Sequence, residues 1–225
     1  MTPSNICTSS AIWDLHIHSN QCTKPNKELA KLPIEKYVDA LLKVFSDYPR
    51  LEMISFTDHN RISEKVYREF FGRKSNVSLV PGIEVDTKLT EDGESKHLVV
   101  YFDCANDEER LSNLCAGVNA IMDEHSVGPD NPIFIHSLFD ELLDLKFKFA
   151  VSPHAFKQKK RGIDWDWHVD GAPSPNIDKY TDQFFAFWEA SGASQVAKAI
   201  EYLEMMDREE RESIVSFSDS KEFRK

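Results

Sequence analysis

The sequence predicts an α/β fold with a mostly parallel sheet. Seven apolar, β-branched or aromatic runs recur along the 225 residues, and most are separated by segments with helical periodicity. Strand–helix alternation over a whole chain is typical of parallel α/β architectures. Hydrophobic residues make up 41% of the chain, which suits a packed globular core. Seven units are compatible with a barrel-like closure as much as with an open sheet.

The expected elements follow one another without a linker. The strand candidates are Ala11–His16, Glu52–Thr57, Ser78–Val85, His97–Phe102, Phe147–Ser152, Phe184–Glu189 and Ser213–Phe217. The helix candidates are Pro33–Asp47, Ile62–Phe71, Asp107–Glu124, Ser137–Leu145 and Ser194–Met206. Because no repeat or low-complexity tract divides the chain, we expect a single domain over residues 1–225.

The net charge, the apolar runs and the cysteine content limit the possible classes of function. A net charge of −11 argues against broad, tight binding of nucleic acid, since phosphate contacts need Lys and Arg. It does not exclude a phosphate substrate held near metal ions. The sequence shows no signal-peptide pattern and no apolar run near the roughly 18 residues that span a membrane, so we expect a cytoplasmic protein. The four cysteines form no Cys-x-x-Cys pair and fit reduced thiols, and we expect Cys22 to be a bystander.

His16 and His18 stand two residues apart in the first strand candidate. Successive side chains of a strand alternate between its faces, so both imidazoles leave the same face near its C-terminal end. Imidazole is the commonest side-chain ligand of Zn-like and Mn-like ions. A pair of surface histidines is the alternative for this motif taken alone.

Further ionisable residues gather at the ends of the strand candidates. They are Asp58 and His59, Glu84, His97, His154 and Asp219. Active sites of parallel α/β folds lie where the strands end, so we expect these side chains to converge. A buried, purely structural carboxylate at Glu84, inside an apolar strand, would be costly. For His125, His136 and His168 a surface or core role is the preferred interpretation.

Residues 156–180 break the strand–helix rhythm. The segment carries basic residues and then tryptophans: Lys157, Lys159, Lys160, Arg161, Trp165 and Trp167. A loop of this length in a compact domain is usually a functional lid or a disordered excursion. Cations suit phosphate groups and indoles suit base stacking, so these residues are candidates for binding substrate. An ordinary surface loop is the alternative.

Five motifs carry a resemblance to a known family. They are Asp14-Leu15-His16-Ile17-His18, Thr57-Asp58-His59, Gly82-Ile83-Glu84, His97-Leu98 and Ser218-Asp219-Ser220. In this order, over nearly the whole chain, they resemble the PHP (polymerase and histidinol phosphatase) superfamily. The resemblance implies a distorted (β/α)7 TIM-like barrel with a two- or three-metal centre. Residues 12–16 and 152–156 are similar to segments of PHP modules of the TrlF-like type. Such modules are fused to an SMC-like or AAA-type ATPase, so the similarity implies an ATPase beyond Lys225.

The resemblance also implies the ligand sets. The first metal ion would take His16, His18, Glu84 and Asp219, and the second would share Glu84 and add His97 and His154. A bridging carboxylate holds two cations about 4 Å apart, where they can activate a water. Asp14 and Asp58 would orient imidazole N–H groups.

One departure from the family pattern concerns the third ion. The family's last motif is usually Asp-x-His, and Lys221 stands in place of that His. The upstream ligand of the third site falls at Thr23 or Lys24, so only His59 remains of that site. We therefore expect two divalent ions (Mn, Zn or Fe), with the ammonium groups of Lys221 and Lys24 near the third position to bind phosphate. Decay of the centre with loss of catalysis is the competing interpretation of Lys221.

The expected activity is hydrolysis of a phosphoester by a metal-activated water, with His59 as general acid and Asp58 and Lys221 in supporting catalytic roles. A nuclease acting on DNA or RNA is favoured over a small-molecule phosphatase of the histidinol-phosphatase type. A non-catalytic metal-bound module that regulates a fused ATPase is a further alternative. The amidohydrolase superfamily also opens with His-x-His, but it usually bridges its metals with a carboxylated Lys.

Overall fold

The structure is a computed structural model, and it describes residues 11–23, 27–104, 107–154, 162–163, 182–190, 193–209 and 213–217. The strands in these ranges are β1 (Ile12–Ile17), β2 (Leu51–Phe56), β3 (Ser78–Lys88), β4 (Lys96–Phe102), β5 (Ile133–Phe134), β6 (Phe149–Pro153), β7 (Trp188–Glu189) and β8 (Ile214–Val215). The helices are the short 3-10 helix η1 (Leu29–Lys31), α1 (Ile34–Ser46), α2 (Glu64–Phe71), α3 (Glu108–Glu124), α4 (Ile135–Asp144) and α7 (Ala193–Met205). The alternation confirms the predicted α/β class.

The strands form a six-stranded sheet and a separate two-stranded one. The larger sheet has the order β1-β2-β3-β4-β6, with β5 paired to β3, and the smaller one joins β7 to β8. Isolated bridges from Val151 to Phe185 and from His154 to Glu189 place the β7 segment beside β6. Within the described ranges no pairing joins β8 to β1, so the sheets are not closed and the expected TIM-like barrel is not confirmed.

The direction of β4 corrects the prediction of a mostly parallel sheet. β4 runs antiparallel to both of its neighbours, β3 and β6. The connection over residues 89–95 is too short for the crossover that a parallel strand needs, so β4 has to return antiparallel. As a result His97, at the start of β4, pairs with Asp86 near the end of β3 and lies at the same end of the sheet as the C-terminus of β6.

Other differences from the predicted elements are local. The predicted strand Phe184–Glu189 is regular only at Trp188–Glu189, because the run meets β6 through isolated bridges rather than a continuous ladder. The predicted strand Ser213–Phe217 narrows to Ile214–Val215. The two-residue strand β5 had no counterpart among the predicted strands.

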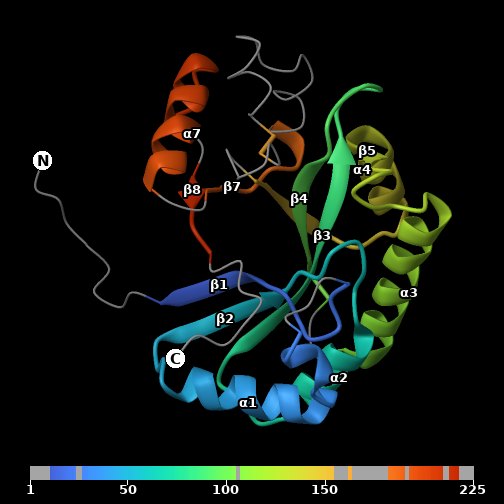
Figure 1. Ribbon diagram of the computed structural model, residues 1–225, viewed down its shortest axis with the longest axis vertical. Coiled ribbons are helices and arrows are strands. Elements are labelled where there is room, and N and C mark those ends of the chain that lie inside the picture. Colours follow the sequence, from blue (N-terminus) through green and yellow to red (C-terminus); the bar gives the residue numbers. More distant parts are fainter. Residues whose placement is uncertain are drawn as a thin grey trace, which may run out of the picture.

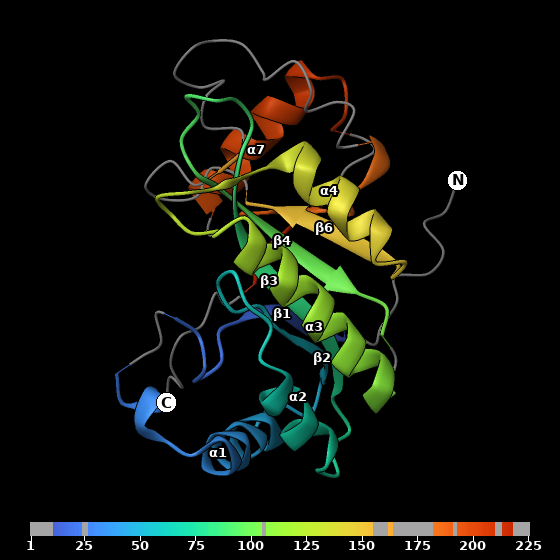
Figure 2. The same ribbon diagram turned by 90° about the vertical axis from the view of Figure 1, so that its right-hand side faces the viewer.

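Helices α1 to α4 pack on one side of the six-stranded sheet, and the opposite side is called the inner side below. α1 and α2 lie against β1 and β2, and α3 and α4 run along the sheet next to β4 and β6 (Figures 1 and 2). On the inner side Leu15, Val99 and Tyr101 form a second, smaller apolar cluster. None of the described helices combines the length and the hydrophobicity needed to cross a membrane.

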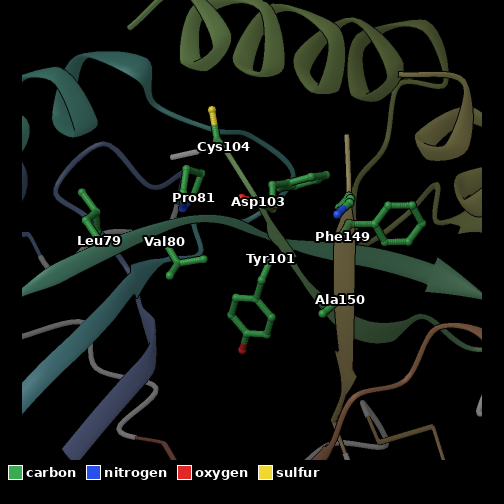
Figure 3. Close-up of a pocket in the computed structure, with 10 residues that line it drawn as sticks. Leu79, Val80, Pro81, Tyr101, Asp103, Cys104, Phe149 and Ala150 are labelled. Carbon is green, nitrogen blue, oxygen red and sulfur yellow. The ribbon is translucent and has the colours of Figure 1, made fainter. Parts of the chain in front are cut away.

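An open pocket of about 480 Å³ lies at one end of β3, β4 and β6 (Figure 3). Its walls are largely apolar and come from residues 79–81, 101–104 and 148–150. These residues lie near the start of β3, at and just after the end of β4, and at and just before the start of β6. Glu84, His97 and His154 lie toward the opposite ends of the same strands, so the pocket is separate from the histidine-rich end of the sheet.

Gly82 on β3 allows close packing between neighbouring strands. A Cβ at this position would lie 2.5 Å from Ser55 Oγ and 2.9 Å from Thr57 Cγ2 on the adjacent strand and its extension. We expect Gly82→Ala to lower the free energy of unfolding by about 1–3 kcal/mol, because the core has to shift to admit the methyl group. Denaturant unfolding measures this change.

Gly72→Ala is the matched control. Its Cβ would meet only two backbone carbonyl oxygens at 3.5 Å, at the C-terminal end of α2. We expect that variant to be at least as stable as the wild type. Equal destabilisation of the two variants would contradict the account of Gly82.

Candidate metal centre

A bulge in β1 brings His16 and His18 to the inner side of the sheet. Asp14 pairs with Ile54 and Ile17 with Phe56, so three residue steps on β1 face two steps on β2. An extra residue of this kind bends a strand and re-aims the side chains that follow it. Both imidazoles are fully buried, and their ring centroids are 5.1 Å apart. The expected convergence of the pair is therefore present.

Glu84 on β3 occupies the centre of the site and is 2% exposed. Three imidazole nitrogens approach its Oε2 atom. His59 Nδ1 lies 2.9 Å away, His18 Nε2 3.3 Å away and His16 Nε2 3.5 Å away. One carboxylate oxygen is thus surrounded by side chains from β1 and from the segment after β2.

The other oxygen of Glu84 faces a different pair of histidines. His97 Nδ1 contacts Oε1, and His154 Nε2 lies 3.5 Å from the same atom. Among the described residues, two groups with donor atoms within 4.8 Å of one another share Glu84: His16, Glu84 and His154, and His59, Glu84 and His97. The six side chains therefore make one continuous cluster around a single carboxylate.

The donor set fits divalent metal ions. Glu84 Oε2 is buried and accepts no hydrogen bond from the described residues, although three imidazole nitrogens lie within 3.5 Å of it. Nitrogen lone pairs gather around a carboxylate in this manner when both coordinate the same cation. Imidazole and carboxylate together suit Mn, Fe and Zn. A bound cation would also offset the cost of burying so many polar groups.

The electrostatics of the cluster are strongly coupled. Burial is the largest influence on Glu84 and raises its pKa, but the imidazoles of His16, His59 and His97 outweigh it and hold that pKa well below its usual range. Burial likewise lowers the pKa of His16, yet the carboxylates of Glu189 and Glu84 raise it to about 10. His16 therefore keeps a proton in the metal-free protein, and a cation has to displace that proton, so metal affinity rises with pH.

Glu189 belongs to the site although our sequence interpretation did not select it. It ends β7, is fully buried, and its Oε1 and Oε2 atoms lie 3.0 Å and 2.8 Å from His16 Nδ1. Because His16 Nε2 faces Glu84, a proton on Nδ1 donated to Glu189 fixes the ring in the tautomer that leaves Nε2 free to bind metal. The sequence did indicate Glu189 as a candidate, because it is a carboxylate at the end of an aromatic run.

Asp86 plays the corresponding part for His97. Its Oδ1 atom lies 3.1 Å from His97 Nε2 and accepts a hydrogen bond from Ser95 Oγ, while Oδ2 accepts one from Asn60 Nδ2. Burial raises the pKa of Asp86, but His97 and these hydrogen bonds outweigh it and lower the pKa. Asp86 follows Glu84 by two residues, so strand alternation could have identified it.

Asp58 supports the loop after β1 instead of an imidazole. Its carboxylate accepts hydrogen bonds of 2.6 Å from both the backbone N–H and the hydroxyl of Ser19. Burial is the main reason that the pKa of Asp58 rises to about 6. The residue therefore fixes the backbone that directly follows His18.

The remaining predicted residues fall into two sets. His125 contacts Glu141 and His136 packs beside the ring of Phe134, as the preferred structural interpretation of these histidines expected. Several predicted functional residues lie outside the described residues: Lys24, Lys157, Lys159, Lys160, Arg161, Trp165, Trp167, Asp219 and Lys221. His168, expected to have a surface or core role, also lies outside them.

The orienting role of Glu189 generates a prediction. Glu189→Gln removes the charge that holds the Nδ1 proton of His16, so we expect metal affinity to fall about 10- to 100-fold. Competition against a chromophoric chelator measures the affinity. Glu141→Gln is the matched control, because Glu141 makes a similar carboxylate–imidazole contact of 2.9 Å to His125, away from the cluster. Similar affinities in the two variants would contradict the role of Glu189.

Comparison with known proteins supports the fold. No family model matches the sequence, and no curated protein matches it either. An amidohydrolase from Chromobacterium violaceum, solved with bound sulfate and no metal, is 12% identical with a TM-score of 0.55, over 93% of this chain and 87% of that chain. A "putative metal-dependent phosphoesterase" from Bifidobacterium adolescentis is 12% identical with a TM-score of 0.52, over 95% of this chain and 88% of that chain. At this identity the likeness shows that the chain shares the fold of these proteins.

Proposed function

We propose that the protein is a divalent-metal-dependent phosphoesterase. The observation that carries the proposal is the division of the imidazoles between the two oxygens of Glu84, with His16, His18 and His59 at Oε2 and His97 and His154 at Oε1. A carboxylate flanked on both sides in this way suits the bridge of a two-metal centre. The name of the Bifidobacterium adolescentis neighbour agrees with this reaction class.

Each side chain has a part in this mechanism. When bound, divalent ions supply Lewis acidity, which makes water a nucleophile at neutral pH and offsets charge on phosphoryl oxygens. Glu84 would hold an ion with each of its two oxygens, and Glu189 and Asp86 orient His16 and His97. His59, in the segment after β2, is the proposed general acid for the leaving oxygen. Asp219, as a further ligand, and the ammonium groups of Lys221 and Lys24, as phosphate contacts, complete the proposal.

Within this class we favour a nuclease with a PHP-type barrel and two ions at the Glu84 cluster. The support is the resemblance of the motifs and the basic and aromatic composition of residues 157–167. A single domain over residues 1–225, a cytoplasmic location and a fused SMC-like ATPase stay predictions. A small-molecule phosphatase and a non-catalytic module that regulates that ATPase are the alternatives.

Amidohydrolase chemistry is a second candidate, because the Chromobacterium violaceum neighbour is named for it. Against it, the proposed bridging residue here is Glu84, whereas that superfamily usually bridges its metals with a carboxylated lysine.

A substrate panel tests the proposal. We expect metal-depleted protein to regain activity with Mn²⁺, Zn²⁺ or Fe²⁺ against bis(p-nitrophenyl) phosphate and against DNA or RNA, and not against p-nitrophenyl acetate. Glu84→Gln should lower that activity on the order of 1,000-fold, because a bridging ligand is worth several kcal/mol in the transition state. Glu141→Gln is the control, and thermal melting shows whether each variant is folded. Phosphodiester cleavage that survives both chelation and Glu84→Gln, or cleavage of the acyl ester alone, overturns the assignment.

A further inference from the structure

Cys22 lies against the Glu84 cluster, beside the edge of the His18 ring that faces away from Glu84. Its Sγ atom is 3.6 Å from His18 Nδ1, whereas Nε2 of the same ring faces Glu84. The side chain is 4% exposed, in the turn after β1, where its backbone N–H donates a hydrogen bond to Ser19. Cys22 therefore has a fixed, buried position beside one of the candidate ligands.

His59 completes a third donor group with this thiol. One donor atom each from His18, Cys22 and His59 lies within 4.8 Å of the other two, and all three residues are buried. The rings of His18 and His59 are stacked, with centroids 4.6 Å apart. This third group differs from the other two because it contains a sulfur atom in place of Glu84.

The spacing matches that of ligands that share one ion. A tetrahedral zinc ion has a Zn–S distance of about 2.3 Å and Zn–N distances of about 2.0–2.1 Å, which places a sulfur and a nitrogen ligand about 3.6 Å apart. The distance between Cys22 Sγ and His18 Nδ1 is 3.6 Å. This separation is therefore the one expected of two atoms that bind the same cation.

We propose that Cys22, His18 and His59 form a thiolate-containing subsite that takes one thiophilic divalent cation beside the Glu84 cluster. The inference deepens the proposed function and rests on its metal centre, because His18 and His59 belong to both. With a cation in the subsite, His59 is a ligand of that cation and no longer the general acid. It departs from our expectations from the sequence, which treated Cys22 as a bystander and the third ion as absent. A thiolate ligand favours Zn²⁺ or Co²⁺ over Mn²⁺ and Mg²⁺, so the subsite would distinguish among ions that the Glu84 cluster accepts alike.

Cobalt substitution tests the subsite independently of activity. Metal-depleted protein loaded with Co²⁺ should show a near-ultraviolet sulfur-to-cobalt charge-transfer band in addition to the visible ligand-field bands. Cys22→Ser should lose that band and bind one fewer ion by elemental analysis, while the visible bands of cobalt at the Glu84 cluster remain. Cys104→Ser is the matched control, because Cys104 is a buried thiol that belongs to none of the donor groups found among the described residues. That variant should keep the band.

The outcomes separate this inference from the proposed function. Phosphoester hydrolysis by a cobalt-loaded wild type without the band, or with a band that persists in Cys22→Ser, overturns the subsite and leaves the proposed function standing. A band that depends on Cys22, in a protein with no hydrolytic activity, supports the subsite and overturns the function. Should Cys22→Ser not fold, X-ray absorption at the zinc edge of the wild-type protein decides. A sulfur shell at about 2.3 Å supports the subsite, and nitrogen and oxygen scatterers alone overturn it.

Discussion

The burial of the Glu84 carboxylate among five imidazoles is the interaction on which the rest of the site depends. A carboxylate at 2% exposure is costly unless its charge is compensated, and the surrounding imidazoles supply both the compensation and the donor atoms. The protonated His16 expected in the metal-free protein is part of this balance. Glu189 and Asp86 form an outer layer of carboxylates that fixes the orientation of the rings.

The fold explains how residues so far apart in the sequence meet. β1, β2 and β6 deliver their candidate ligands at or just beyond their C-terminal ends, β3 delivers Glu84 from its middle, and β4 delivers His97 near its start. The antiparallel direction of β4 makes this possible, because it brings the beginning of that strand to the end of β3. Gly82 contributes by letting β3 approach Ser55 and Thr57, which keeps Glu84 close to the histidines of β1. The apolar pocket at the other end of these strands has no part in the cluster.

Strand periodicity and the position of ionisable residues at strand ends were enough to predict that most of these side chains converge. His16, His18, Glu84, His97, His154 and His59 converge as expected. Glu189 and Asp86 carried the same kind of signal but lacked a motif that singled them out. The position of Cys22 could not be inferred, because the turn after β1 has no periodicity that links spacing to direction. Whether the sheet closes into a barrel could not be predicted either, because closure depends on pairing between the first and last strands. The short connection over residues 89–95 does predict the antiparallel direction of β4, but our sequence interpretation did not use it.

Direct binding of divalent cations by Glu84 and its histidines is the central proposal. Anomalous diffraction from crystals grown with Mn²⁺ or Zn²⁺ tests it most directly. We expect the strongest anomalous peaks within about 2.0–2.3 Å of a Glu84 oxygen and of the facing imidazole nitrogens. A map with no peak at Glu84, in which the imidazoles donate hydrogen bonds straight to its carboxylate, would contradict the claim.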